Sequence, residues 1–532
     1  MAVFLLVTAV VIIACVLLNK LSSKLGIPML LAFIVLGMVF GGDGLFGIEF
    51  EDYTFAEQIC STALIFIMFY GGFGTKWSEA KPIAVKATLL STVGVVLTAG
   101  ITGLFCHFVL NFTLLEGLLV GAVVSSTDAA SVFSILRSNR LNLKHRTASL
   151  LEVESGSNDP CAYMLTAIVL SFINGTADGG RIAYEIFAQI VYGAAFGVLI
   201  AFLAGLVLKR HRFSTSGFDT AFVLAVAILA YAAPAALGGN GYLSAYIVGI
   251  YLGNTDIKNK KALVNFFDGL TGLMQMLLFF LLGLLATPSR MPPVILPALL
   301  LFLFITLIAR PAAVFAILAP FKCNWRQSLL VSWAGLRGAA SIVFAVIATV
   351  GLASGAHDIF HTVFLIVLFS IPVQGSLIPF FAKKLDMIDD TEDVMKTFSD
   401  YSDEVPIQYI QFTIPTGHAW NNMRVGEIHL PPDTILVIVK RKGKSLIPHG
   451  KTVIHEGDTM VLSAKAPGEI EGMQLSEKYL AKGDPLIGHK LSELPKREGR
   501  LIVMIQRDSK IIIPKGDTVL KAGDMLVINR VD

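Results

Sequence analysis

Charge is scarce over most of this sequence. The chain has 532 residues, of which 15% are charged and 55% hydrophobic, with a mean hydropathy of +0.71. Soluble proteins carry about 25% charged residues. Residues 1–384 hold only 40 of the 81 Lys, Arg, Asp and Glu residues, and residues 385–532 hold the other 41. The shortage excludes a soluble fold for the first part, which we expect to be a membrane domain followed by a soluble one.

Cysteine and net charge are also low. Five scattered cysteines form neither a disulfide framework nor a zinc-binding spacing. A formal net charge of +3 gives no reason to expect nucleic acid as a partner. We find no nucleophile–base set and no phosphate-binding loop, so we expect neither an enzyme nor a cofactor. Residues 2–18 lack a basic start and a small-residue cleavage site, so they predict a first spanning helix and not a removed signal.

Apolar runs long enough to cross about 30 Å of hydrocarbon occur thirteen times. They lie near 2–18, 27–42, 56–72, 83–109, 113–136, 147–173, 184–208, 219–237, 240–253, 263–286, 293–319, 327–352 and 359–381. The loops on one side hold nineteen Lys and Arg residues, and those on the other hold only Arg181 and Arg290. By the positive-inside rule, the N-terminus is outside and the charged tail is cytoplasmic. The sequence therefore predicts a polytopic α-helical membrane protein with 13 transmembrane helices.

Seven ionisable residues remain inside these runs, where each is costly and typically faces a partner or a water-filled path. They are Asp128, Glu152, Glu154, Asp159, Asp268, Arg310 and Arg337. Helical spacing in the sixth run places Glu152, Ser155 and Asp159 on one face. Asp159 lies 13 residues beyond Arg146, roughly 20 Å along a helix and therefore near mid-membrane. This run is well suited to hold an ion.

Two other runs are interrupted by polar or glycine residues at matching depth. Residues 125–131 read Ser-Ser-Thr-Asp-Ala-Ala-Ser in the fifth run, and residues 335–341 read Gly-Leu-Arg-Gly-Ala-Ala-Ser in the twelfth. Interrupted spans in corresponding positions of two halves indicate a transporter's midplane site. The twelfth run is seven spans after the fifth. Because seven is an odd number, the two runs enter the membrane from opposite sides. We therefore expect inverted repeats with broken helices 5 and 12.

Oxygen atoms of Asp159, Ser155 and Thr127 suit a hard monovalent cation, and no imidazole or thiolate accompanies them. A carboxyl group removed from water is unfavourable in its charged form, so it binds either a proton or a metal ion. Competition of this kind, coupled to alternating access, is cation/proton antiport. One carboxylate cycling between the two predicts electroneutral one-for-one exchange. We also expect Glu154 to pair with Arg337 and Asp268 to pair with Arg310.

Three segments carry a family resemblance: residues 154–160, 126–130 and 335–339. They are similar to the signature segments of NhaP-type monovalent cation:proton antiporters, including the bacterial potassium/proton branch. The resemblance implies a homodimer with a six-helix core that moves as an elevator. It implies roles for the following residues: Asp159 as the shared carboxylate, Ser155 and Thr127 as ligands beside Asp128, Asn158 as the orienting amide, and Glu154 with Arg337 as a structural ion pair. One departure concerns Tyr70, which stands where relatives often have an acidic residue.

The tail repeats itself at an offset of 66 residues. Residues 447–458 and 513–524 share the pattern Ile-Pro-x-Gly-x-Thr-Val-x-x-x-Gly-Asp. We therefore divide the chain into an exchanger domain (1–384), an acidic linker (385–404) and two α+β modules (405–468 and 469–532). Both modules resemble the C-terminal subdomain of RCK (TrkA-C) potassium-transport regulators. That resemblance implies a regulatory unit that dimerises, for which a nucleotide such as c-di-AMP is a candidate effector. A packing module without a ligand is the alternative.

These observations predict an inner-membrane antiporter that exchanges a monovalent cation for H⁺, with K⁺ favoured and Na⁺ as the alternative. The preference for K⁺ rests on the tail and on Tyr70. A ligand-gated cation channel is the second hypothesis, since a regulatory tail is present, but no filter sequence supports it. A symporter for an organic solute is the third.

Overall fold

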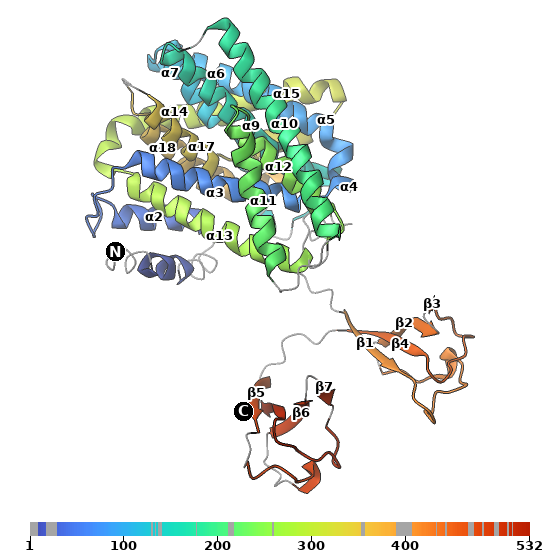
Figure 1. Cartoon of the computed structure of the whole chain (residues 1–532). Helices are drawn as coiled ribbons and strands as arrows, with labels where there is room; N and C mark the ends of the chain where they lie inside the picture. The colour runs from blue at the N-terminus through green and yellow to red at the C-terminus, as the bar shows by residue number, and fades with distance from the viewer. Residues whose placement is uncertain are drawn as a thin grey trace. The chain divides into compact units, whose positions relative to one another are not determined.

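The protein is described by a computed structural model that separates into a helical unit, Met1–Ser402, and a β-rich unit, Asp403–Asp532 (Figure 1). The structure describes residues 9–17, 29–128, 131–132, 135–136, 141–176, 178–210, 217–257, 260–352, 357–389, 407–431, 434–441, 444–465, 473–480, 484–493, 500–507, 510–512 and 514–531.

The helical unit is a bundle of long apolar helices joined by short turns. Its α-helices are α2 (Met29–Phe40), α3 (Tyr53–Gly74), α4 (Trp77–Ala80), α5 (Ala84–Leu89), α6 (Val95–Leu110), α7 (Leu114–Val124), α9 (Thr147–Ile173), α10 (Gly179–Arg210), α11 (Phe218–Ala235), α12 (Gly241–Gly253), α13 (Lys260–Leu285), α14 (Pro292–Phe304), α15 (Arg310–Leu318), α16 (Trp325–Trp333), α17 (Ala339–Gly351) and α18 (Ile359–Lys384). Two π-helical segments, Leu90–Gly94 and Ile305–Ala309, join α5 to α6 and α14 to α15.

Seven helices within the described residues are long and apolar enough to cross a membrane, some of them built from consecutive elements. They are Tyr53–Gly74, Trp77–Leu110, Gly179–Arg210, Phe218–Ala235, Lys260–Leu285, Pro292–Phe321 and Ile359–Lys384. Other apolar helices, among them α2, α7, α12 and α17, are shorter. A multi-pass membrane protein is therefore confirmed, whereas the count of thirteen spans stays a prediction.

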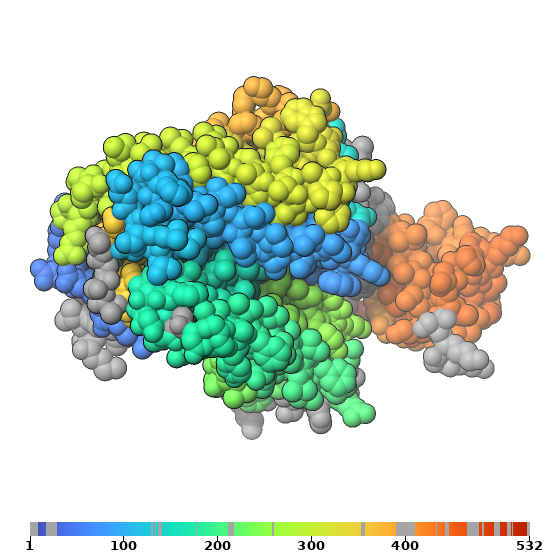
Figure 2. All heavy atoms as spheres, turned by 90° about the horizontal axis from the view of Figure 1, so that it is seen from above, coloured from blue at the N-terminus to red at the C-terminus, as the bar shows by residue number. Residues whose placement is uncertain are grey.

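Helices on the outside of the helical unit expose large apolar side chains. Figure 2 shows one face of this unit, with α6 in blue, α10 in green and α14 in yellow. Large apolar side chains on these helices are exposed, such as Phe108, Phe202 and Leu296. An exposed apolar belt of this size is expected of a bilayer-spanning surface.

Two helices of the bundle are joined by backbone contact through glycines. A Cβ atom on Gly72 of α3 would lie 2.4 Å from the carbonyl oxygen of Tyr246 in α12. A Cβ atom on Gly249 of α12 would lie 2.2 Å from the carbonyl oxygen of Phe69 in α3. Small residues permit this close approach, which is a common way for membrane helices to associate. The two backbones therefore come close together at these glycines.

The β-rich unit contains two four-stranded antiparallel sheets with the same topology. The first has the order β1-β4-β2-β3 and the second the order β5-β8-β6-β7. Both sheets have a register shift at the same place, Leu436/Ile438 in one and Ile502/Met504 in the other, an offset of 66 residues. The strands are β1 (Ile407–Thr413), β2 (Thr434–Arg441), β3 (Lys444–Leu446), β4 (Thr459–Lys465), β5 (Met473–Tyr479), β6 (Arg500–Arg507), β7 (Lys510–Ile512) and β8 (Met525–Val531).

The expected α+β character of the modules is not observed. Within the described part of the tail, the helical segments are two 3₁₀ turns, Val425–Glu427 and Leu491–Glu493. Proline and glycine around the first turn, such as Pro415, Gly417 and Pro431, prevent a longer helix from forming. The prediction of α-helices in these modules is therefore wrong for the residues described.

Each module contains the same ion pair between a half-buried arginine and a buried aspartate. Arg507 donates through Nε and Nη2 to the two carboxylate oxygens of Asp524, both at 2.7 Å, and through Nη2 to the Val519 carbonyl at 2.8 Å. Arg441 contacts Asp458 and Val453 in the same way in the first module. The hydrogen bonds from Arg507 hold the pKa of Asp524 below its ordinary value. The carboxylate of the Gly-Asp pair that recurs in the two repeats thus has a structural role in both modules.

We expect Arg507→Gln to destabilise the second module by about 2 kcal/mol, because it leaves the Asp524 carboxylate buried without its cation. Hydrogen exchange of the full-length protein should show faster exchange in β6 and β8. The first module, with Arg441 intact, is the internal control and should not change. Because the folded pKa of Asp524 is lowered, its contribution is present above about pH 4 and is lost as the pH falls further. Unchanged exchange in β8 would contradict this role.

Candidate functional site

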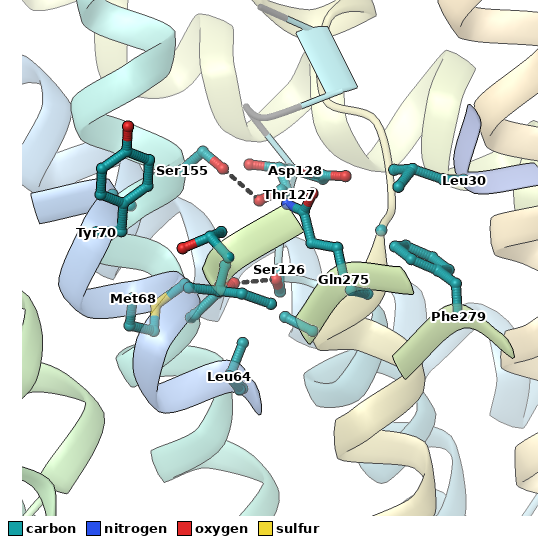
Figure 3. A pocket seen from close by; sticks show the side chains of 18 of the residues that line it. Leu30, Leu64, Met68, Tyr70, Ser126, Thr127, Asp128, Ser155, Gln275 and Phe279 are labelled. Atoms are coloured by element: carbon teal, nitrogen blue, oxygen red, sulfur yellow. Dashed lines mark hydrogen bonds between the residues drawn. The ribbon is translucent and has the colours of Figure 1, made fainter. Parts of the chain in front are cut away.

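A cavity of about 480 Å³ lies inside the helical unit and is lined by residues of six elements. Leu64, Met68 and Tyr70 of α3 form one wall, and Gln275 and Phe279 of α13 form another (Figure 3). The remaining lining comes from α2, from α9, from residues 126–128 and from the start of α17. Four carboxylate residues line this cavity: Asp128, Glu152, Asp159 and Asp268.

Two non-helical segments meet beside the cavity. Helix α7 ends at Val124, and residues 126–128 that follow it are not helical; α16 ends at Trp333 and α17 begins only at Ala339. The N–H of Asp128 donates to the carbonyl of Leu336 at 2.8 Å, so the two segments are joined directly. Backbone groups released by a broken helix inside a membrane must find such partners. This hydrogen bond therefore gives a partner to one backbone N–H and one backbone carbonyl that lie outside the helices.

Asp159 lies on α9 in the wall of the cavity and is 4% exposed. The hydroxyl of Ser126 donates to its Oδ1 atom. The structure shows neither buried arginine bonded to it, since Arg310 and Arg337 have other partners among the described residues. Asp159 is therefore a buried carboxylate at the cavity wall with one neutral donor among the described residues, where a negative charge is unfavourable without a proton or a cation nearby.

The other predicted site residues surround the same segment. The Ser155 hydroxyl donates to the carbonyl of Thr127, and the Asn158 side-chain amide donates to Thr127 Oγ1 at 2.5 Å. These two bonds fix the non-helical segment against α9. Asn158 Oδ1 is buried without a hydrogen-bond partner among the described residues. Hydroxyl, amide and carboxylate oxygens thus gather where the sequence predicted a hard-cation site.

Asp128 points toward the other interrupted helix. Its Oδ2 accepts a hydrogen bond from the Ser131 hydroxyl at 2.6 Å. A Cβ atom on Gly338 would lie 2.4 Å from this carboxylate oxygen, so only glycine leaves room for Asp128 there. Gly338 is a residue whose role the sequence did not reveal.

The predicted pairing of Glu154 with Arg337 is wrong. Arg310 forms the pair instead, with its Nη2 atom 2.6 Å from Glu154 Oε1, and both side chains are at most 2% exposed. Arg310 begins α15 directly after a π-helical segment, and it packs against Gly335 in the interrupted helix, where a Cβ atom would come within 2.8 Å of Nε. The spacing along the chain does not show which of two buried arginines faces Glu154, because the extra residue of a π-turn rotates the helix.

Arg337 takes a different partner. Its Nη1 donates to the carbonyl of Ser126 at 2.9 Å, while Nε and Nη2 have no hydrogen-bond partner among the described residues. Its backbone N–H donates to Ser370 Oγ at 3.0 Å. Arg337 therefore holds the backbone of the segment whose Ser126 hydroxyl reaches Asp159.

The predicted pairing of Asp268 with Arg310 is also wrong. The Tyr70 hydroxyl donates to Asp268 Oδ1 at 3.2 Å, and both residues line the cavity. Thr271 and Gln275 lie on the same side of α13, and the Thr271 hydroxyl is buried without a partner among the described residues. The spacing i, i+3, i+7 from Asp268 would have identified this face, because such residues share one side of a helix.

Comparison with known proteins gives the family. A family model described as "Sodium/hydrogen exchanger, transmembrane" matches residues 8–384. The chain belongs to the sodium/hydrogen exchanger family. A second model, the TrkA-C domain, matches residues 409–471 and 476–528 of this exchanger. The resemblances read from the sequence are therefore confirmed for both parts.

Named relatives agree with the family. The exchanger is 33% identical over 529 residues to the K(+)/H(+) antiporter NhaP2 of Shewanella sp. (strain MR-4), covering 99% of this chain and 80% of the relative. It is 34% identical over 465 residues to the K(+)/H(+) antiporter NhaP of Alkalimonas amylolytica, covering 86% and 81%. The structure of the sodium proton antiporter MjNhaP1 from Methanocaldococcus jannaschii at pH 8 matches with a TM-score of 0.63 and 24% identity, over 72% of this chain and 99% of that one. The last match shows a shared fold.

We expect Arg310→Met to destabilise the exchanger by about 3 kcal/mol or more, because it leaves Glu154 buried without a cation. Adding Glu154→Gln should recover much of the loss, since the uncompensated charge is then gone. Arg337→Met should cost less, because its observed partner is a carbonyl. Thermal unfolding in detergent measures all three. Equal coupling of Glu154 with Arg337 would instead restore the original pairing.

Proposed function

We propose that this exchanger carries a monovalent cation one way and H⁺ the other at the cavity around Asp159. The observation that supports it is a buried carboxylate without a basic partner among the described residues, in a cavity lined by further oxygen atoms. The two buried arginines are bonded to Glu154 and to the Ser126 carbonyl, so they leave Asp159 to other cations.

Competition at one carboxylate accounts for coupling. When Asp159 releases its proton, its negative charge favours a cation in the cavity. The hydroxyl of Ser126 and the oxygens near Thr127 lie close enough to serve as further ligands. When it takes a proton, the attraction for the cation is lost. Because one charge leaves as the other binds, we expect electroneutral one-for-one exchange. The binding site then changes sides with the core while Asp159 is neutralised, which avoids moving a bare charge through hydrocarbon.

We further propose the architecture predicted from the sequence: thirteen spans with an inverted repeat and an N-terminus outside the inner membrane. The interruptions after α7 and between α16 and α17 support it, because they meet at one depth and hydrogen-bond to each other. Broken helices that meet at a midplane site are typical of transporters with inverted repeats. A homodimer is part of the same proposal, through the family resemblance.

The division into an exchanger domain (1–384), a linker (385–404) and two modules (405–468 and 469–532) is also our proposal. It is supported by the family matches and by the two equivalent sheets. We propose that the modules regulate exchange, with a nucleotide such as c-di-AMP as a candidate effector.

We propose K⁺ as the favoured cation and Na⁺ as the alternative. Relatives that align with almost the whole chain are named K(+)/H(+) antiporters. Tyr70 places a neutral hydroxyl where an acidic side chain is common in relatives, and its bond to Asp268 keeps that carboxylate at the cavity wall. With one negative charge fewer, the cavity wall has a weaker electrostatic field, which suits K⁺ because K⁺ is larger and more weakly hydrated than Na⁺. The names of the relatives describe antiporters, so a ligand-gated channel is not favoured.

Asp159→Asn should abolish cation-dependent proton movement in proteoliposomes while leaving the protein folded, because the amide keeps the shape but cannot exchange a proton for a cation. Asp178→Asn is the matched control, since Asp178 only caps the start of α10 through the Arg181 N–H at 2.8 Å. Exchange at the normal rate in Asp159→Asn vesicles would refute the proposed site. A current proportional to turnover would refute electroneutrality.

Asp268→Asn should raise the half-saturating cation concentration more than it lowers the maximal rate, because Asp268 adds negative charge to the cavity wall without contacting Asp159 directly. Tyr70→Phe should shift the ratio of K⁺ to Na⁺ transport, since it frees Asp268 from its hydroxyl donor. Exchange assays across Li⁺, Na⁺, K⁺ and Rb⁺ measure both effects. Identical ion profiles in all three chains would contradict a role for this wall.

A further inference from the structure

The chain does not leave the helical unit directly at the end of α18. Residues 385–389 run antiparallel to residues 142–144, which precede α9. The Lys144 N–H donates to the Met387 carbonyl at 2.8 Å, and the Asp389 N–H donates to the Asn142 carbonyl at 2.9 Å. Leu143 and Ile388 face each other between these bonds. We call residues 385–389 and 142–144 the tether strand pair.

Apolar side chains anchor the tether strand pair in the bundle. Leu385 is 7% exposed and Met387 is 1% exposed. They belong to a buried cluster with Leu143 and with Leu330 and Leu336, which lie in and just after α16. The segment is therefore packed as part of the membrane unit and is not merely the start of a linker.

One carboxylate joins the tether to both elements that lead to the cation site. Asp386 lies 3.0 Å from Lys144 Nζ and 3.6 Å from Arg326 Nη1. Lys144 stands just before α9, which carries Asp159, and Arg326 is in the first turn of α16, which leads to the interruption with Arg337. The hydrogen bond from Lys144 lowers the pKa of Asp386, which is therefore anionic at neutral pH.

The backbone of this region is held in an unusual conformation. Asp386, His145 and Arg146 have φ values of 53°, 60° and 54°, in the left-handed region that residues other than glycine rarely adopt. Such conformations persist only where the surrounding contacts impose them, and they concentrate in segments that switch between two states. Two of the three lie in the turn between the tether strand pair and α9.

We propose that the tether strand pair transmits the state of the C-terminal modules to the cation site. The inference rests on the proposed exchange function. Every covalent connection from the modules to the membrane unit passes through residues 385–389, and these residues hold the cytoplasmic ends of α9 and α16. When paired, they fix α16, after which Leu336 lies, and α9, whose Ser155 and Asn158 bond to Thr127 beside Asp128. In this way they keep the site organised. When separated, α9 and α16 lose that constraint and the site binds its cation more weakly.

The simpler reading is that the pair only caps the membrane domain. If the pair is only a cap, weakening it affects exchange independently of any change in the modules. If it transmits their state, the effect of a change in a module depends on the pair. The test therefore needs a perturbation of a module and a perturbation of the pair in the same full-length chain. Arg441→Gln loosens the first module by removing its cation from Asp458. Asp386→Asn weakens the pair while suiting the left-handed backbone.

We expect Arg441→Gln to raise the half-saturating cation concentration by about fivefold, within the usual range for coupled sites. Asp386→Asn should raise it similarly, and the double variant should show no further increase. Glu185→Gln, which removes an exposed ion pair with Arg181, is the matched control and should leave the effect of Arg441→Gln intact. Additive effects of Arg441→Gln and Asp386→Asn would overturn the proposal, as would the absence of any effect of Arg441→Gln.

A reversible lock gives a second test. Leu143 and Ile388 form the closely spaced, non-hydrogen-bonded type of antiparallel pair, so Leu143→Cys with Ile388→Cys should form a disulfide. Cys323→Ser removes the one native cysteine that is not buried. In the Arg441→Gln chain, oxidation should restore the native half-saturating concentration and reduction should abolish the restoration. A lock that leaves the defect of Arg441→Gln unchanged would overturn the proposal.

Hydrogen exchange separates this inference from the transport function itself. The amides of Lys144 and Asp389 are the donors of the tether strand pair, so their exchange rates report its separation without any ion movement. Arg441→Gln should accelerate both, and unchanged rates would overturn the inference. Native vesicles that show no cation-dependent proton movement would instead refute the exchange function.

Discussion

The hydrogen bond between the Asp128 N–H and the Leu336 carbonyl is the contact on which the site depends. Inside a bilayer a helix cannot stop without leaving backbone groups unsatisfied. Here the segments that follow α7 and α16 give each other one hydrogen-bond partner, and they present side chains in place of a continuous helical surface. Ser126, Thr127 and Asp128 line the cavity in this way, and Gly338 leaves room for Asp128.

The buried charged side chains near the contact of Asp128 with Leu336 have different partners. Arg310 neutralises Glu154, and Arg337 binds a carbonyl of the interrupted segment, so both permanent cations are committed to structure. Asp159 has only a hydroxyl donor among the described residues. In our proposal, the same burial that favours an ion pair at Glu154 makes the charged form of Asp159 favour a mobile cation. Structural and transported charges are thus separated by less than two helical turns of α9.

The sequence predicted those features that depend on local patterns. The bounds of α9, the polar interruption at residues 125–128 and the repeat in the tail follow from hydrophobic runs, polar clusters and turn residues, and the structure agrees with them. The partners of Arg310 and Asp268 were predicted wrongly, because they depend on the rotation of one helix against another. A single π-turn before Arg310 changes that rotation, and no residue pattern marks it. The α-helices expected in the modules failed for a local reason, since proline and glycine leave room only for 3₁₀ turns.

The glycine contact between α3 and α12 limits how the molecule can rearrange. Where two backbones touch through Gly72 and Gly249, neither helix can slide without a collision between main chains. The two helices therefore form a rigid pair, and the cavity-lining residues Met68 and Tyr70 of α3 belong to it. The pair also contacts the rest of the core, because α3 packs on α17 and Tyr246 of α12 lies against Gly156 of α9. In our proposal, the ion therefore enters a cavity one wall of which, α3, is braced by both α12 and α17.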